Sequence, residues 1–169
     1  MAGRGLDGMT EGIRALLVHR HEHRGDNLIL RSTLQSILEL YTGALAAEDG
    51  AAPPPDGAAQ RRLEDTAARV CGTGALELIA DALLLCEEGS IADTRTARSV
   101  EALCLEILEH LTRTEAGSRA LVGSEVTRAE CVRWMVVRSL GERFFGPGLL
   151  GRMETLIPSE EDFGRLCPR

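Results

Sequence analysis

The feature that most constrains the fold is the helical spacing of apolar residues between Thr94 and Thr112. At 100° per residue, the apolar side chains of this stretch fall within an arc of about 140°. They are Ala97, Val100, Leu103, Cys104, Ile107, Leu108 and Leu111. The acidic residues Glu101, Glu106 and Glu109 lie outside the arc. The pattern therefore predicts an amphipathic helix that buries one face and exposes its glutamates.

The stretch 26–45 has the same spacing, with Asp26 as a suitable N-cap. Its apolar positions match those of 94–112 at a constant separation of 70 residues: Leu30 with Val100, Leu34 with Cys104, Ile37 with Ile107, Leu38 with Leu108, and Tyr41 with Leu111. Two shorter stretches, 11–17 and 73–79, match at a separation of 62 residues and place Gly12 opposite Gly74. These matches predict a structural repeat. The alternative is a plain helical bundle in which two amphipathic helices match by chance.

Proline and glycine divide the chain into segments. The run at 46–60 contains three consecutive prolines, which end a helix and stiffen a loop. A second loop is expected at 86–96, with Asp93 and Thr94 starting the next helix. We expect a flexible N-terminus at 1–10, a helical domain at 11–143 interrupted by the 46–60 loop, and a C-terminal cap at 144–169.

Composition excludes several classes of protein. The net charge is −7 and aromatic residues make up 3% of the chain, which suits neither phosphate contacts nor base stacking, so no nucleic acid is expected as a partner. Residues typical of β-sandwiches and barrels are scarce. All 19 basic residues are arginine, so lysine-based catalysis is excluded. No apolar run approaches the roughly 20 residues that span a bilayer, and no membrane association is expected.

The five cysteines include no CxxC pair. Three of them lie in apolar helical contexts, where a reduced cysteine acts as a small hydrophobic residue. The first 20 residues lack the pattern of a secretory signal peptide. We therefore expect a cytoplasmic protein.

The stretches GALELIADALL (74–84) and ARSVEALCLEILEHLTRTEAGSRALVG (97–123) resemble an armadillo repeat. They share its Gly-Ala start, its second helix, and a third helix that ends before an EGRxALV-like turn. The residues 12–40 are similar, and a third unit starts near Gly123 and runs through ECVRWMVVRSL. HEAT repeats have a comparable pattern. The resemblance covers about 11–140 and implies an all-α fold, a short armadillo/HEAT-like α-solenoid with a C-terminal helical cap.

The resemblance also implies a non-catalytic protein–protein interaction module, a scaffold or adaptor, with no cofactor. Many peptide-binding armadillo repeats carry an asparagine on the inner face of the third helix. Here that position holds His110 in one unit and Leu40 or Glu39 in the other. An importin-like grip on an extended basic peptide is therefore not expected. The acidic net charge still favours a basic protein or peptide as the partner.

Trp134 is the leading candidate for contact with a partner. The inward face of its helix is formed by Val132, Met135, Val136 and Ser139, and Trp134 lies near the opposite side, one turn from Glu130 and Arg138. Tryptophan is the commonest interface anchor. The candidate partner-binding residues are Trp134, Arg138, Glu130 and His110. The competing interpretation is a tryptophan buried against the next helix or the C-terminal cap.

His19, His21 and His23 form the sequence HRHEH and are the candidate metal ligands. On a helix, His19 and His23 share a face but His21 points away. The favoured interpretation is a solvated polar helix end, so no metal is expected. The alternative function is that of a metal-binding helical protein or enzyme that uses these three histidines.

Overall fold

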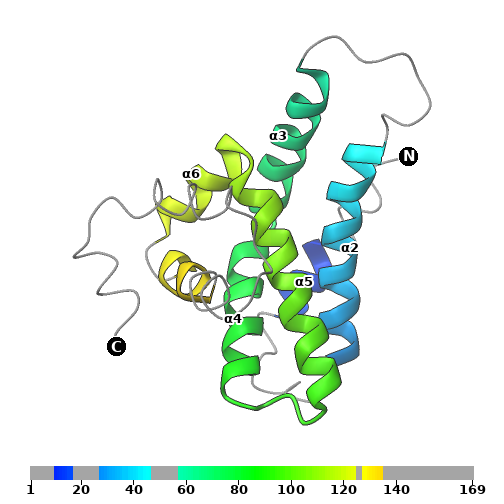
Figure 1. Cartoon of the computed structure of the whole chain (residues 1–169), viewed down its shortest axis with the longest axis vertical. Helices are drawn as coiled ribbons and strands as arrows, with labels where there is room; N and C mark the ends of the chain where they lie inside the picture. Colours follow the sequence, from blue (N-terminus) through cyan, green and yellow to red (C-terminus); the bar gives the residue numbers. More distant parts are fainter. Residues whose placement is uncertain (1–9, 17–26, 47–56, 125–126, 135–169) are drawn as a thin grey trace.

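The computed structural model describes residues 10–16, 27–46, 57–124 and 127–134 (Figure 1). Every regular element among these residues is a helix, which confirms the expected all-α class. The first and last helical stretches are 10–16 and 127–134. Between them lie α2 (Asn27–Ala46), α3 (Ala58–Cys71), α4 (Ala75–Glu87), α5 (Thr94–Thr112) and α6 (Glu115–Gly123).

The start of α5 is fixed by Asp93, as the sequence predicts. The Asp93 carboxylate accepts hydrogen bonds from the backbone N–H groups of Arg95 at 3.3 Å and Thr96 at 2.8 Å, which satisfies two donors that the helix itself leaves open. In the loop before it, Gly89 takes a left-handed conformation with φ of 66°. The corresponding cap of α2, Asp26, lies outside the described residues.

The helix α3 begins inside the stretch that the sequence assigns to the 46–60 loop. Gly57 has φ of 93°, a left-handed conformation that favours glycine, and its carbonyl oxygen accepts the Arg61 N–H at 3.0 Å. The helix therefore starts at Ala58, directly after this turn. The preceding helix, α2, ends at Ala46, close to the expected boundary.

The helices α2 and α5 lie side by side and run in the same direction, although α3 and α4 separate them in the sequence (Figure 1). The helix α3 packs on both α2 and α6, and α4 packs against α5. The helix α5 therefore has α2 on one side and α4 on another, and it is the central element of the described structure.

The stripes that the sequence match predicts form part of the core, together with buried residues of α3, α4 and α6. All ten residues of the five matched pairs are buried, and none exposes more than 7% of its surface. The expectation for Glu101 is wrong: it is only 8% exposed. The reason is that α5 is covered by more than one helix, so its buried arc extends beyond the apolar stripe. Leu105, one turn further along the same side, is buried as well.

Among the described residues, no helix is both long and apolar enough to cross a membrane. The expected C-terminal cap at 144–169 and most of the expected flexible N-terminus at 1–10 lie outside the described residues. These two boundaries of the domain organisation therefore stay predictions.

Candidate interaction surface

The contact between α2 and α5 includes a stacked pair of rings near the C-terminal ends of the two helices. The Tyr41 and His110 ring centroids are 5.5 Å apart and the ring planes differ by 8°. In the sequence repeat, Tyr41 corresponds to Leu111, the neighbour of His110. The two parallel helices therefore contact each other at equivalent levels. The Tyr41 hydroxyl is buried without a hydrogen-bond partner in the described part of the chain, and burial raises its pKa.

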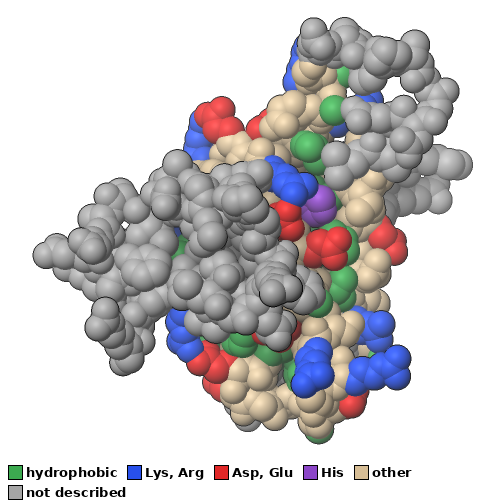
Figure 2. Space-filling model, in the orientation of Figure 1, with side chains coloured by type: hydrophobic (Ala, Val, Ile, Leu, Met, Phe, Trp, Pro, Cys, Tyr) green, Lys and Arg blue, Asp and Glu red, His purple; other side chains and the backbone are tan. Residues whose placement is uncertain are grey.

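His110 is the more exposed residue of this ring pair. It is half-buried, and it is the purple side chain in Figure 2. Burial and the nearby Arg113 guanidinium both lower the His110 pKa, because each disfavours the charged imidazolium. His110 is therefore held neutral at pH 7. A neutral ring stacks on Tyr41 without placing a charge at the helix contact.

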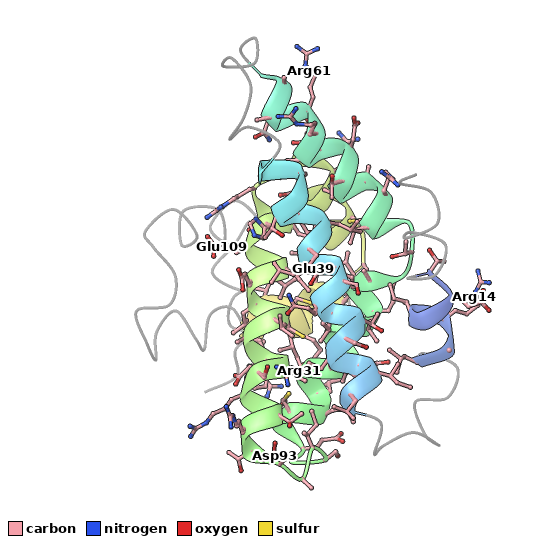
Figure 3. All side chains as sticks on the ribbon, turned by 90° about the vertical axis from the view of Figure 1, so that its right-hand side faces the viewer. Arg14, Arg31, Glu39, Arg61, Asp93 and Glu109 are labelled. Atoms are coloured by element: carbon pink, nitrogen blue, oxygen red, sulfur yellow. The ribbon has the colours of Figure 1, made fainter. Side chains whose placement is uncertain are left out.

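Two glutamates of α5, Glu106 and Glu109, lie near His110 and partly offset the lowering of its pKa. Glu39 of α2 and Glu109 of α5 are equivalent in the repeat and come from neighbouring helices (Figure 3). Glu109 forms an ion pair with Arg113, and Glu39 accepts a hydrogen bond from Gln35 at 3.4 Å. We name this surface the α2–α5 face, defined by Glu39, Glu106, Glu109 and His110.

A pocket of about 320 Å³ lies between α2 and α3. Leu40 and Ala44 contribute apolar surface from α2. One face of α3 contributes the polar lining, with residues spaced at i, i+3, i+4 and i+7: Arg62, Asp65, Thr66 and Arg69. We name it the α2–α3 pocket. Sequence reasoning missed it because the spacing has meaning only once α3 is known to be a helix that lies beside α2.

Glu64 joins α3 to the start of α6. Its carboxylate accepts the backbone N–H groups of Glu115 at 2.8 Å and Ala116 at 3.0 Å, and these bonds lower the Glu64 pKa. At the same helix start, the Thr114 hydroxyl accepts the Gly117 N–H at 3.1 Å. The carboxylate therefore adds a second cap from a distant part of the chain and fixes α6 against α3.

Trp134 is less exposed than its helical position predicts. It is half-buried and packs against the core, and its indole N–H is buried without a hydrogen-bond partner among the described residues. Its helical stretch, 127–134, is tied to α4 by an ion pair between Arg133 and Glu87. Cys131, one turn before Trp134, is fully buried, so this side of the helix also faces the core.

The other candidate residues are separated in the chain. Glu130 is half-buried on the same helical stretch as Trp134, with one carboxylate oxygen buried. His110 instead belongs to the α2–α5 face. Arg138 lies outside the described residues, as do His19, His21 and His23. The grouping of Trp134 with Arg138 and the alternative metal site at the three histidines are therefore not tested by the described residues.

The cysteines that the structure describes are free thiols. Cys104 and Cys131 are buried, and burial raises the pKa of both, for Cys131 to about 12. Burial also raises the pKa of Cys86 to about 11. These groups are therefore protonated at pH 7 and act as small apolar side chains. Among the described residues, no group of three or more His, Cys, Asp or Glu side chains is arranged to hold a metal ion.

Comparisons with protein-family models, with curated proteins and with solved structures find no match to this chain.

Proposed function

We propose that this protein is a non-catalytic interaction module, a scaffold or adaptor, built as a short armadillo/HEAT-like solenoid. The observation that carries the proposal is the parallel contact of α2 and α5 at equivalent levels, with Tyr41 stacked on His110. Stacked units of a solenoid place corresponding helices next to each other in the same direction. A simple up-and-down bundle would instead pair sequential helices in antiparallel orientation.

The contacts of α3 support the same interpretation. It packs on α2, the helix before it, and on α6, the first helix after α5. In a solenoid, α2 and α5 would be the long helices of two units, and α3 and α6 would be the helices that follow them. Stacking of the two units would then make α3 and α6 neighbours, as it does α2 and α5. Contacts limited to adjacent units are typical of solenoids.

Solenoids use the surface formed by stacked helices to bind other proteins. In this chain the α2–α5 face is the corresponding surface. Its three glutamates, Glu39, Glu106 and Glu109, favour a partner with a polar surface. The net charge of −7 favours encounter with a basic protein or peptide through long-range attraction. The cysteines of the described residues are free thiols, which supports the cytoplasm as the proposed site of this interaction.

The proposal is tested by site-specific photocrosslinking in cells of the native host. A photoreactive residue is placed at Glu39 or Glu106 on the α2–α5 face, and at the exposed Glu88, near the end of α4, as the matched control. We expect a discrete protein adduct from the first two positions and none from Glu88. The adduct partner is then purified and must bind the unmodified chain directly. Equal labelling from all three positions, or no direct binding, would overturn the proposal.

A further inference from the structure

The α2–α3 pocket is large enough for a side chain of a bound peptide. Its volume of about 320 Å³ is at the lower end of the range for ligand sites. Leu40 and Ala44 give it an apolar wall on α2. Arg62, Thr66 and Arg69 give it hydrogen-bond donors on α3. An apolar wall with donors on the opposite side fits an aliphatic side chain that is followed by an acidic group.

The charge of the pocket is opposite to that of the whole chain. Two arginines and one aspartate line it, whereas the chain carries a net charge of −7. Arg62 is half-buried and already makes an interaction within the molecule. Arg69 is exposed, and the described part of the chain offers it no ion-pair partner. Arg69 is therefore the lining cation that is available to an incoming carboxylate.

We infer that the α2–α3 pocket is a docking site for an acidic peptide segment of a protein partner, and this inference rests on the proposed function as an interaction module. An aliphatic side chain of the peptide lies against Leu40 and Ala44. A neighbouring carboxylate of the peptide accepts charge-assisted hydrogen bonds from Arg69, which are among the stronger polar contacts in proteins. Asp65 weakens the site by repulsion.

An acidic segment at this pocket is compatible with the acidic net charge of the chain. Charges more than about 8–10 Å apart are largely screened at physiological ionic strength, so net charge acts mainly on the rate of encounter. At contact distance, the side chains that line the pocket decide which group is held. A partner with a basic surface and one acidic segment satisfies both conditions.

The test uses three fluorescein-labelled nine-residue peptides, each with a central leucine. The leucine is flanked by two glutamates on each side in the first peptide, by glutamines in the second and by lysines in the third. Fluorescence polarisation measures the Kd of the full chain for each peptide. We expect the glutamate peptide to bind tightest, with an affinity that falls as salt is added.

Variants of the chain test whether the preference for the glutamate peptide arises from the α2–α3 pocket. Arg69→Gln is expected to weaken binding of the glutamate peptide about tenfold, because one charge-assisted contact is lost. Arg61→Gln is the matched control: it removes the same charge from the same helix, but Arg61 projects away at the end of the molecule (Figure 3) and does not line the pocket. It should change Kd less than about twofold, whereas Asp65→Asn should tighten binding about threefold.

The outcomes separate this inference from the proposed function. Binding that is equal for the three peptides, or equally weakened by Arg69→Gln and Arg61→Gln, overturns the acidic docking site and leaves the interaction module standing. Absence of binding by all three peptides also overturns the docking site. The crosslinking at Glu39 and Glu106 tests the proposed function as an interaction module separately, since it requires no synthetic peptide. Thermal melting of each variant confirms that it is folded.

Discussion

Replacing Gly117 by alanine should destabilise the protein, although the same change inside a helix is usually favourable. A Cβ atom at Gly117 would meet the carbonyl oxygen of Leu111 at 2.3 Å and the Thr114 hydroxyl oxygen at 2.7 Å. The first neighbour is backbone and has no rotamer to change. The α5–α6 corner must therefore move apart to accept a single methyl group.

The expected cost is the balance of three effects. Alanine gains about 1 kcal/mol over glycine from helix propensity. Forcing a methyl group into a filled space costs typically about 1–3 kcal/mol. The shift also strains the Thr114 cap, in which the hydroxyl donates to the Leu111 carbonyl at 2.7 Å and accepts the Gly117 N–H at 3.1 Å. Loss of such a cap costs about 1 kcal/mol. Gly117→Ala should therefore lower the free energy of unfolding by about 1–3 kcal/mol.

Gly43→Ala is the matched control. Gly43 lies within α2, is exposed, and has nothing within 4 Å of the position that an added Cβ atom would take. Here only the propensity gain acts, so we expect a stabilisation of roughly 0.5–1 kcal/mol. Urea denaturation followed by circular dichroism at constant pH measures both variants. If the two substitutions stabilise the protein equally, the close packing at the α5–α6 corner is refuted.

Four further outcomes are expected. Leu108 is fully buried, so Leu108→Ala should cost about 2–5 kcal/mol in the same titration, and a loss below about 1 kcal/mol would show that the stripe is misassigned. Glu64→Gln should cost about 1 kcal/mol at pH 7. As the pH falls below about 4.5 and then through the lowered pKa of Glu64 in the folded protein, the parent should lose this stabilisation. The variant should not. Substituting His21 and His23 together should change neither the melting temperature nor the zinc content; a zinc-dependent rise in melting temperature in the parent that the variant lacks would establish a metal site. Trp134→Ala should cost about 2 kcal/mol, since the ring is half-buried, and should also weaken partner binding; unchanged binding would exclude Trp134 from the partner surface.

Local signals in the sequence predict α2 and α5 well. The boundaries of α5 and its Asp93 cap follow from residues that lie within one or two turns of each other. The buried stripe of α2 and α5 follows from periodicity, because one face of each helix is apolar enough to be assigned without its neighbours. These are properties of single helices, which do not depend on how the rest of the chain packs.

Features that depend on two distant segments could not be predicted. The burial of Glu101 results from the covering of α5 by neighbouring helices, and nothing near Glu101 in the sequence indicates it. Glu64 caps a helix that starts 51 residues later, so no capping motif is visible locally. The α2–α3 pocket needs Leu40 and Arg69 to meet across two helices. In each case the decisive partner is supplied by tertiary packing.

The bond from Glu64 to α6 has a consequence for how the chain folds during synthesis. The start of α6 depends on a carboxylate from α3, and α3 leaves the ribosome first because it precedes α6 in the chain. When α6 emerges, its acceptor is already in place. The reverse order would leave the first N–H groups of α6 open until a later segment arrived. A circular permutant that begins at α4 and ends with α3 would create this situation, and its folding during synthesis should be slower than that of the parent.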